Sequence, residues 1–155
     1  MPRIDELPLW LRAVLRAYPW RRIDPVPCAP LRKPLAEARI ALVTTAGLHL
    51  PEQPPFDNDK RGGDTSYRLI PNDADVATLR ESHRSETFDH AGVQSDPNLA
   101  FPLDRLREMR LTLAPRHLSF MGSITAPGRL IAESAPGAAQ LLVDDGVDAA
   151  LLVPI

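Results

Sequence analysis

Apolar residues recur along the chain at two different spacings. Residues 5–19 place large apolar side chains three or four positions apart, which predicts an amphipathic helix that ends at Pro19. Residues 24–34 follow and contain four prolines. Because proline removes a hydrogen-bond donor and restricts the residue before it, this stretch is expected to run extended as a strap or linker.

Two short, continuous apolar runs predict strands buried on both faces of a parallel sheet. They are residues 38–45 (ARIALVTT) and residues 147–155 (VDAALLVPI). Residues 128–144 show a helical pattern that the proline and glycine at 136–137 must kink or divide. Helix, glycine and strand in this order form the second half of a βαβ crossover, so the two strands are expected to lie parallel in one sheet.

The segments between these elements are mostly polar. Residues 51–67 form a long excursion rich in Pro, Gly and Asp, and residues 82–98 are also irregular in pattern. Shorter helices are predicted at 73–79 and 102–109, and residues 117–121 form a short segment before a glycine. Loops as long as these within a compact domain are commonly functional or disordered.

These elements predict an α/β protein with two parts. Residues 1–34 form an N-terminal helix and a Pro-rich strap, and residues 35–155 form a parallel-sheet, Rossmann-like domain with long loops. The domain is expected to be incomplete at its C-terminus, because the apolar strand at 147–155 is not followed by a covering helix. The alternative is that this strand lies at a sheet edge or in an oligomer interface.

Composition narrows the class of protein. With 44% hydrophobic and 25% charged residues the 155-residue chain is typical of a globular domain. A net charge of −2 supplies no basic field for nucleic acid or an anionic membrane. No run approaches the roughly 20 apolar residues of a membrane span, no secretion signal is recognisable, and Cys28 is the single cysteine. A cytoplasmic location is therefore expected.

Candidate chemistry is expected where parallel strands end, since open sheets bind ligands beyond their carboxyl edges. The turn after the first strand ends in Gly47 and His49, and the polar segment at 82–98 contains His83 and His90. Imidazoles and carboxylates suit zinc or iron. No pair has the spacing of a known metal motif, so hydrogen bonds that order the loops are the simpler interpretation and no metal is expected.

A series of longer motifs follows along the chain in a fixed order. They are ALVTTAGLHL (41–50), PFD (55–57), GDTSYR (63–68), IP (70–71), SH (82–83), DH (89–90), DPN (96–98), FPLDRL (101–106), SFMG (119–122) and DGVDA (145–149). Over residues 33–155 this order resembles the N-terminal half of the selenoprotein B family of glycine, sarcosine and betaine reductases. That group includes the selenocysteine subunit of D-proline reductase.

The resemblance implies a reductase subunit that cleaves a bond next to a carbonyl, commonly carbon–nitrogen, in a small amino acid or amine derivative. In the family a selenolate or thiolate attacks the substrate, and its residue is expected directly after Ile155. The hypothesis is that an in-frame UGA follows and that the chain is a truncated selenoprotein. Apart from selenocysteine no cofactor is expected. Implied partners are other reductase subunits and a thioredoxin-like electron donor, within an oligomer.

Residues that match the family's motifs are expected to bind the substrate. They are Thr45, Gly47, His49, Asp57, Tyr67, His83 and His90. The sequence departs from the family in two respects, since it has neither selenocysteine nor cysteine at the expected place, and Leu111-Thr112-Leu113 stands where a glycine-containing turn is expected.

Two other functions remain open from the sequence. One is a catalytically inactive binding or scaffold subunit that pairs its last strand with a partner. The other is a metal-dependent enzyme that uses His49, His83 and His90.

Overall fold

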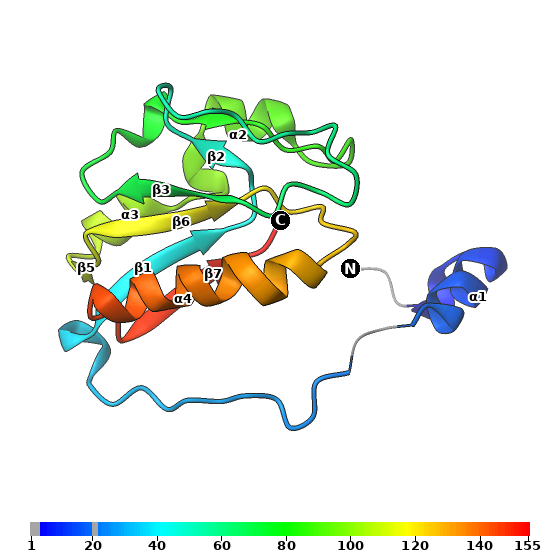
Figure 1. Ribbon diagram of the computed structural model, residues 1–155, viewed down its shortest axis with the longest axis horizontal. Helices are drawn as coiled ribbons and strands as arrows, with labels where there is room; N and C mark the ends of the chain where they lie inside the picture. The colour runs from blue at the N-terminus through cyan, green and yellow to red at the C-terminus, as the bar shows by residue number, and fades with distance from the viewer. Residues whose placement is uncertain (1–3, 20–21) are drawn as a thin grey trace. The chain divides into compact units, whose positions relative to one another are not determined.

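The computed structural model describes residues 4–19 and 22–155. The chain divides into two compact units, Met1–Pro30 and Leu31–Ile155 (Figure 1). The first unit contains a short 3₁₀ helix, η1 (Ile4–Glu6), and the amphipathic helix α1 (Leu9–Ala17), neither of which buries a residue. The helix predicted over residues 5–19 is thus confirmed as α1.

The second unit is built on a mixed sheet around β1 (Arg39–Thr44). On one side β1 pairs in parallel with β7 (Ala149–Val153), over five consecutive positions. On the other side it pairs in parallel with β5 (Thr112–Leu113) and then with β6 (Arg116–Phe120). An antiparallel strand, β3 (Tyr67–Pro71), pairs with β6. The predicted parallel pairing of the first and last strands is therefore confirmed.

Helices cover the two faces of this sheet (Figure 1). One face carries α4 (Ala135–Asp144), which continues from the π-helical segment η5 (Leu130–Ser134). The opposite face carries α2 (His90–Ser95) and α3 (Leu103–Glu108). The helix predicted over 128–144 is thus one helical run whose geometry changes at Ser134, just before the proline and glycine at 136–137.

Small elements complete the unit. The 3₁₀ helices are η2 (Leu35–Glu37), η3 (Val76–Thr78) and η4 (Pro97–Leu99). A two-residue strand, β2 (Leu48–His49), pairs antiparallel with β4 (Arg80–Glu81) in a separate small sheet. The short helix expected at 73–79 is therefore only the single turn η3.

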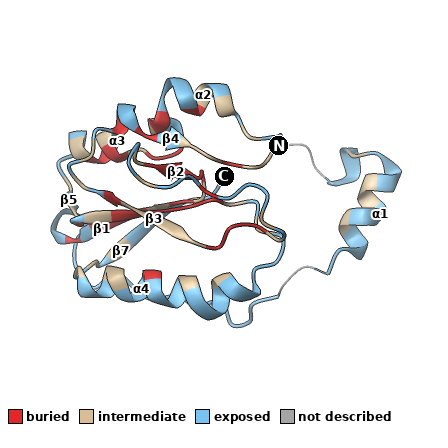
Figure 2. Ribbon diagram, turned by 45° about the horizontal axis from the view of Figure 1, so that its top comes forward, coloured by how far each residue is buried: buried red, intermediate tan, exposed pale blue. Residues whose placement is uncertain are grey.

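Alternating side chains of β1 fill two apolar clusters. Ile40 and Leu42 join a large cluster with Phe101 and Leu103 under α2 and α3. Val43 packs on the opposite side, in a smaller cluster under α4 that includes Leu118. Figure 2 shows buried residues concentrated along β1 and α3, whereas most of α4 is exposed. A strand buried on both faces thus forms the centre of the unit, as the sequence predicted.

The expectation of a second fully buried strand is wrong for β7. Its burial is intermediate at both ends and exposed in between, with Leu152 66% exposed. Among the described residues β7 pairs with β1 alone, so it occupies an edge of the sheet. The apolar pattern at 147–155 therefore identified a strand correctly but overstated how much of it is covered.

A buried histidine of β6, His117, is hydrogen-bonded to β1 next to the segment that connects β5 and β6. Ile40 of β1 pairs with Leu113 of β5, and Val43 of β1 pairs with Leu118 of β6. The chain therefore advances three residues along β1 but five residues from β5 to β6. This bulge removes a main-chain acceptor. The imidazole Nδ1 of His117 replaces it and accepts the main-chain N–H of Leu42 at 3.0 Å.

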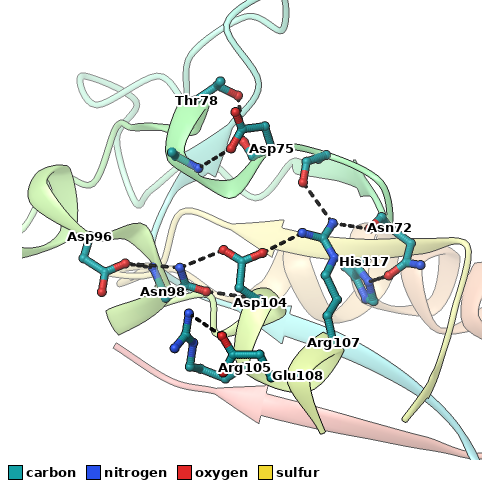
Figure 3. A network of polar contacts seen from close by, with 12 residues as sticks. Asn72, Asp75, Thr78, Asp96, Asn98, Asp104, Arg105, Arg107, Glu108 and His117 are labelled. Atoms are coloured by element: carbon teal, nitrogen blue, oxygen red, sulfur yellow. Dashed lines mark hydrogen bonds and ion pairs between the residues drawn. The ribbon is translucent and has the colours of Figure 1, made fainter. Parts of the chain in front are cut away.

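The His117 ring is fixed from its other side by Asn72, whose side-chain oxygen lies 3.2 Å from Nε2. The main-chain N–H of Asn72 donates to Pro115 inside the bulge, and Arg107 donates to the carbonyls of Asn72 and Ala74. Figure 3 shows Arg107 between Asp104 and Asn72, with His117 next to them. Burial, reinforced by the charge of Arg107, lowers the pKa of His117 to about 4. The imidazole is therefore neutral at physiological pH.

Replacing His117 by leucine is expected to reduce the free energy of unfolding by about 1–3 kcal/mol at pH 7, because the buried N–H of Leu42 loses its acceptor. Wild type should also lose stability as pH falls from 6.5 towards 4, because the unfolded histidine binds a proton that the folded one excludes. This linkage amounts to roughly 3 kcal/mol. Urea unfolding at pH 7 and pH 5 measures both effects, and an equally steep pH dependence in the leucine variant would contradict this role.

Candidate functional site

The parallel strands β1, β6 and β7 end at the same edge of the sheet, and the residues that follow them are tied together. The N–H of Thr45 donates to the carbonyl of Val153 at 3.2 Å. The Thr45 hydroxyl accepts the N–H of Ile155 at 2.9 Å and lies 3.3 Å from the Ile155 carbonyl. The residues that follow β7 are thus held against the turn that follows β1.

Gly47 connects this edge to the polar segment that follows β4. Its N–H donates to Phe120 at 2.8 Å, and its carbonyl accepts the N–H of Ser82 at 3.0 Å. The residue has a φ of +67°, and a Cβ there would lie 3.1 Å from main-chain atoms of Ser82 and His83. Glycine is needed at this position for both its conformation and its size.

Gly122, directly after β6 and Met121, is closely surrounded by main-chain and side-chain atoms. Its φ is +69°, and a Cβ would lie 2.4 Å from the carbonyl oxygen of Thr45 and 2.9 Å from Nε2 of His83. The next residue, Ser123, also has a positive φ of +46°. A two-residue left-handed turn therefore packs against the His83 ring at the carboxyl edge.

A cavity of about 540 Å³ opens beside this turn. Its walls combine the apolar side chains of Phe88, Val93 and Leu99 with polar groups of Ser85 and Asp89. His83, Ser123 and Ile155 also line it. A mostly apolar cavity with a few polar groups is typical of a small-molecule site.

The polar wall is organised around Glu81. One carboxylate oxygen accepts the main-chain N–H of His83, and the other lies 2.8 Å from Nδ1 of His90. Nε2 of His90 lies 3.0 Å from the carbonyl of Ser85. Phe88 packs between the two imidazoles, with ring centroids 4.5 Å from His83 and 5.0 Å from His90.

The two imidazoles differ in their proton affinity. The hydrogen bond to Glu81 raises the pKa of the partly exposed His90. Burial lowers the pKa of His83, an effect that Glu81 opposes and His90 reinforces. His83 therefore presents a neutral imidazole to the cavity. The imidazole of His90 binds a proton more readily.

Five of the seven predicted substrate-binding residues lie at or beside the carboxyl edge of the sheet. Thr45, Gly47 and His83 meet at the carboxyl edge, and His90 adjoins them through Phe88 and Glu81. His49 is buried next to this group, with Nδ1 2.9 Å from the Leu50 carbonyl and Nε2 3.0 Å from the Ser82 hydroxyl.

The remaining two predicted residues lie elsewhere. Asp57 is exposed in the 51–67 loop, where its N–H donates to Asp64. Burial raises the pKa of Asp64, but hydrogen bonds from Ser66 and Asp57 outweigh it and bring the pKa to about 2, so this carboxylate orders the loop. Tyr67 packs on Phe120, on the face that α4 covers, with ring centroids 5.5 Å apart.

Several residues of the site carried no signal in the sequence. Ser85, Val93 and Ser123 line the cavity, and Glu81 lies beside it and is hydrogen-bonded to His83 and His90. Among the described residues, no group of three or more His, Cys, Asp or Glu side chains is arranged to hold a metal ion.

Taken together, these features define an α/β protein with a cavity, the candidate small-molecule site, beyond the carboxyl ends of its parallel strands. Comparison with protein families makes the assignment specific. Residues 14–154 match the family described as glycine/sarcosine/betaine reductase selenoprotein B. The chain belongs to this family, as its motifs indicated.

Two curated relatives are reductase subunits. The D-proline reductase subunit gamma of Acetoanaerobium sticklandii is 36% identical over 136 residues, which cover 84% of this chain and 54% of the relative. The sarcosine reductase complex component B subunit beta of Peptoclostridium acidaminophilum is 27% identical over 146 residues, covering 87% of this chain and 32% of the relative. The chain thus spans about half the length of the first relative and about a third of the second.

A comparison with solved structures found no match. In the part of the chain that the structure describes, no helix combines the length and apolar character needed to cross a bilayer.

Replacing Gly122 by alanine is expected to destabilise the unit by more than about 1 kcal/mol, because the new Cβ meets a main-chain oxygen in a conformation that L-residues rarely adopt. Gly128 is a matched control, since it is helical and nothing lies within 4 Å of its Cβ position. Alanine there should leave stability unchanged or raise it by up to about 1 kcal/mol. Thermal unfolding of both variants checks this contrast, and equal melting temperatures would contradict the packing described for Gly122.

Proposed function

We propose that this chain is the substrate-binding portion of a selenoprotein B-type reductase subunit. Its reaction is the reductive cleavage of a bond next to a carbonyl, commonly carbon–nitrogen, in a small amino acid or amine derivative. Membership of the family supports the reaction class. The relatives named for D-proline and sarcosine reduction support the substrate class.

The observation that carries the proposal is the cavity at the carboxyl edge, into which Ile155 projects as a lining residue. Polypeptide that continues from β7 would enter the site at this point, held by the bonds between Thr45 and Ile155. A redox residue in that segment would lie next to a bound substrate. We infer that a selenocysteine or cysteine follows β7 in the complete subunit.

The redox residue would supply a selenolate or thiolate that displaces the amine and forms a bond to the substrate carbon. A thiol would then attack the chalcogen, and the carbon would leave with the bonding electron pair and take up a proton. The resulting selenenyl sulfide or disulfide needs two electrons from a dithiol, which a thioredoxin-like donor would provide. The cavity's part is to hold the substrate with the scissile bond facing β7, and its apolar wall limits competing water.

Other reductase subunits are proposed as partners, because both relatives are named as subunits. Cytoplasmic location and assembly into an oligomer belong to the same proposal. A scaffold role without catalysis is the second candidate, and the exposed edge strand β7 favours it, since its backbone and Leu152 offer a surface for strand addition.

Sequencing the gene past codon 155 tests the reductase proposal. An in-frame UGA is expected there, followed by a reading frame that encodes a cysteine and a further α/β unit. Growth of the source organism with labelled selenium should then yield a labelled subunit with a mass greater than 17.1 kDa. A different stop codon, or UGA without a coding frame after it, would contradict the proposal and favour the scaffold role.

A further inference from the structure

The histidines of this chain differ in how their ring nitrogens are satisfied. All four lie in the described residues. In His49, His90 and His117 both nitrogens have a protein partner within 3.2 Å. In His83 only Nδ1 is satisfied, because it accepts the main-chain N–H of Ser85 at 3.2 Å, whereas Nε2 is buried without a partner.

This pattern fixes the tautomer of His83. A ring nitrogen that accepts a main-chain N–H carries no proton, so the proton of the neutral ring resides on Nε2. The side chain is only 5% exposed, and burial lowers its pKa, so the neutral form is the relevant one. His83 therefore presents a buried N–H donor that has no partner within the protein.

The unused donor lies at the border of the cavity. The His83 ring forms part of the wall, with Phe88 stacked on one face, and Nε2 points towards Gly122. The Cβ position of Gly122 lies 2.9 Å from this nitrogen, and the next residue, Ser123, lines the cavity. The buried, unpartnered donor therefore lies beside a turn that borders the cavity, and both residues of this turn have positive φ.

We propose that His83 donates its Nε2–H to an oxygen of the substrate group adjacent to the bond that is cleaved. This inference rests on the reductase function proposed above. The acceptor is a carbonyl or carboxylate oxygen. Asp89 lines the same cavity and gives the amine end of such a substrate an anionic neighbour. Glu81 positions His83 by accepting its main-chain N–H and anchors His90 behind it.

Two variants separate the donor from the rest of the ring. His83→Asn places an amide oxygen near the position of Nδ1, so it keeps an acceptor for Ser85 but removes the donor at Nε2. His83→Gln places an amide nitrogen near the position of Nε2, so it keeps the donor but loses the acceptor for Ser85. A purely structural role would favour the asparagine variant, and a donor role favours the glutamine variant.

The probes are D-proline and sarcosine, and their binding to the 155-residue chain is measured by calorimetry. Affinity should fall about tenfold in His83→Asn, as expected for the loss of one hydrogen bond, and by less than about threefold in His83→Gln. Unchanged affinity in His83→Asn, or equal losses in both variants, would overturn the inference. Circular dichroism checks that both variants fold.

Nitrogen NMR of the wild-type chain labelled at histidine supplies a readout that needs no variant. The Nε2–H resonance of His83 should shift saturably with either probe, while both nitrogens of His117 stay unchanged. An unshifted His83 resonance at saturating probe would overturn the inference even if a variant fails to fold.

The outcomes also separate this inference from the proposed function. If the longer polypeptide contains selenium and cleaves substrate while His83→Asn has an unchanged KM, the role of His83 is wrong and the reductase function stands. If His83 shifts with a probe but no redox residue follows β7, the reductase function is wrong and His83 remains a binding residue. If the wild-type chain binds neither probe, the His83 inference is wrong, and the selenium result alone decides the reductase function.

Discussion

The hydrogen bond from the N–H of Leu42 to His117 is the constraint on which the arrangement of the site depends. It holds β1 beside the segment that runs from β5 to β6, which contains two more residues than the matching part of β1. Without an acceptor at that point the bulge would leave a buried donor unpaired in the centre of the sheet. With it, β6 continues in parallel beyond the bulge and ends where Gly122 meets Thr45.

The carboxyl edge then forms by close main-chain approach rather than by side-chain packing. Gly47 and Gly122 adopt positive φ, and at Gly122 the neighbouring main chain comes closer than a Cβ would permit. This brings His83, from a polar segment after β4, against the end of β6. The cavity lies beside this edge, and Glu81 and Phe88 order its polar wall.

The sequence predicted the central features of the fold because their signals are local. Continuous apolar runs identified β1 and β7, and the helix and glycine before β7 indicated the parallel crossover. It did not predict β3 or the extent of β6, because YRLIP and RHLSF mix charged, polar and proline residues with apolar ones. Helix α2 was also missed, since it is a short segment that contains a glycine and depends on the cap from Asp89.

The candidate site shows the same division. Motif resemblance indicated Thr45, Gly47, His83 and His90, which the structure gathers at one edge. It also indicated Asp57 and Tyr67, which the fold carries to an exposed loop and to the α4 face. Membership of a motif does not specify the direction of a side chain. Ser85 and Ser123 line the cavity only because of main-chain turns, for which a single sequence contains no clear signal.

The most direct test of the central claim is to locate the binding site of a small amino acid on the chain. Methyl NMR with D-proline or sarcosine should give saturable shifts at Val93, Leu99 and Ile155, which line the cavity, and none at Ile131, which is exposed on the π-helical segment. Saturable shifts confined to methyl groups outside the cavity, or none at saturating concentrations, would contradict a substrate site at the carboxyl edge.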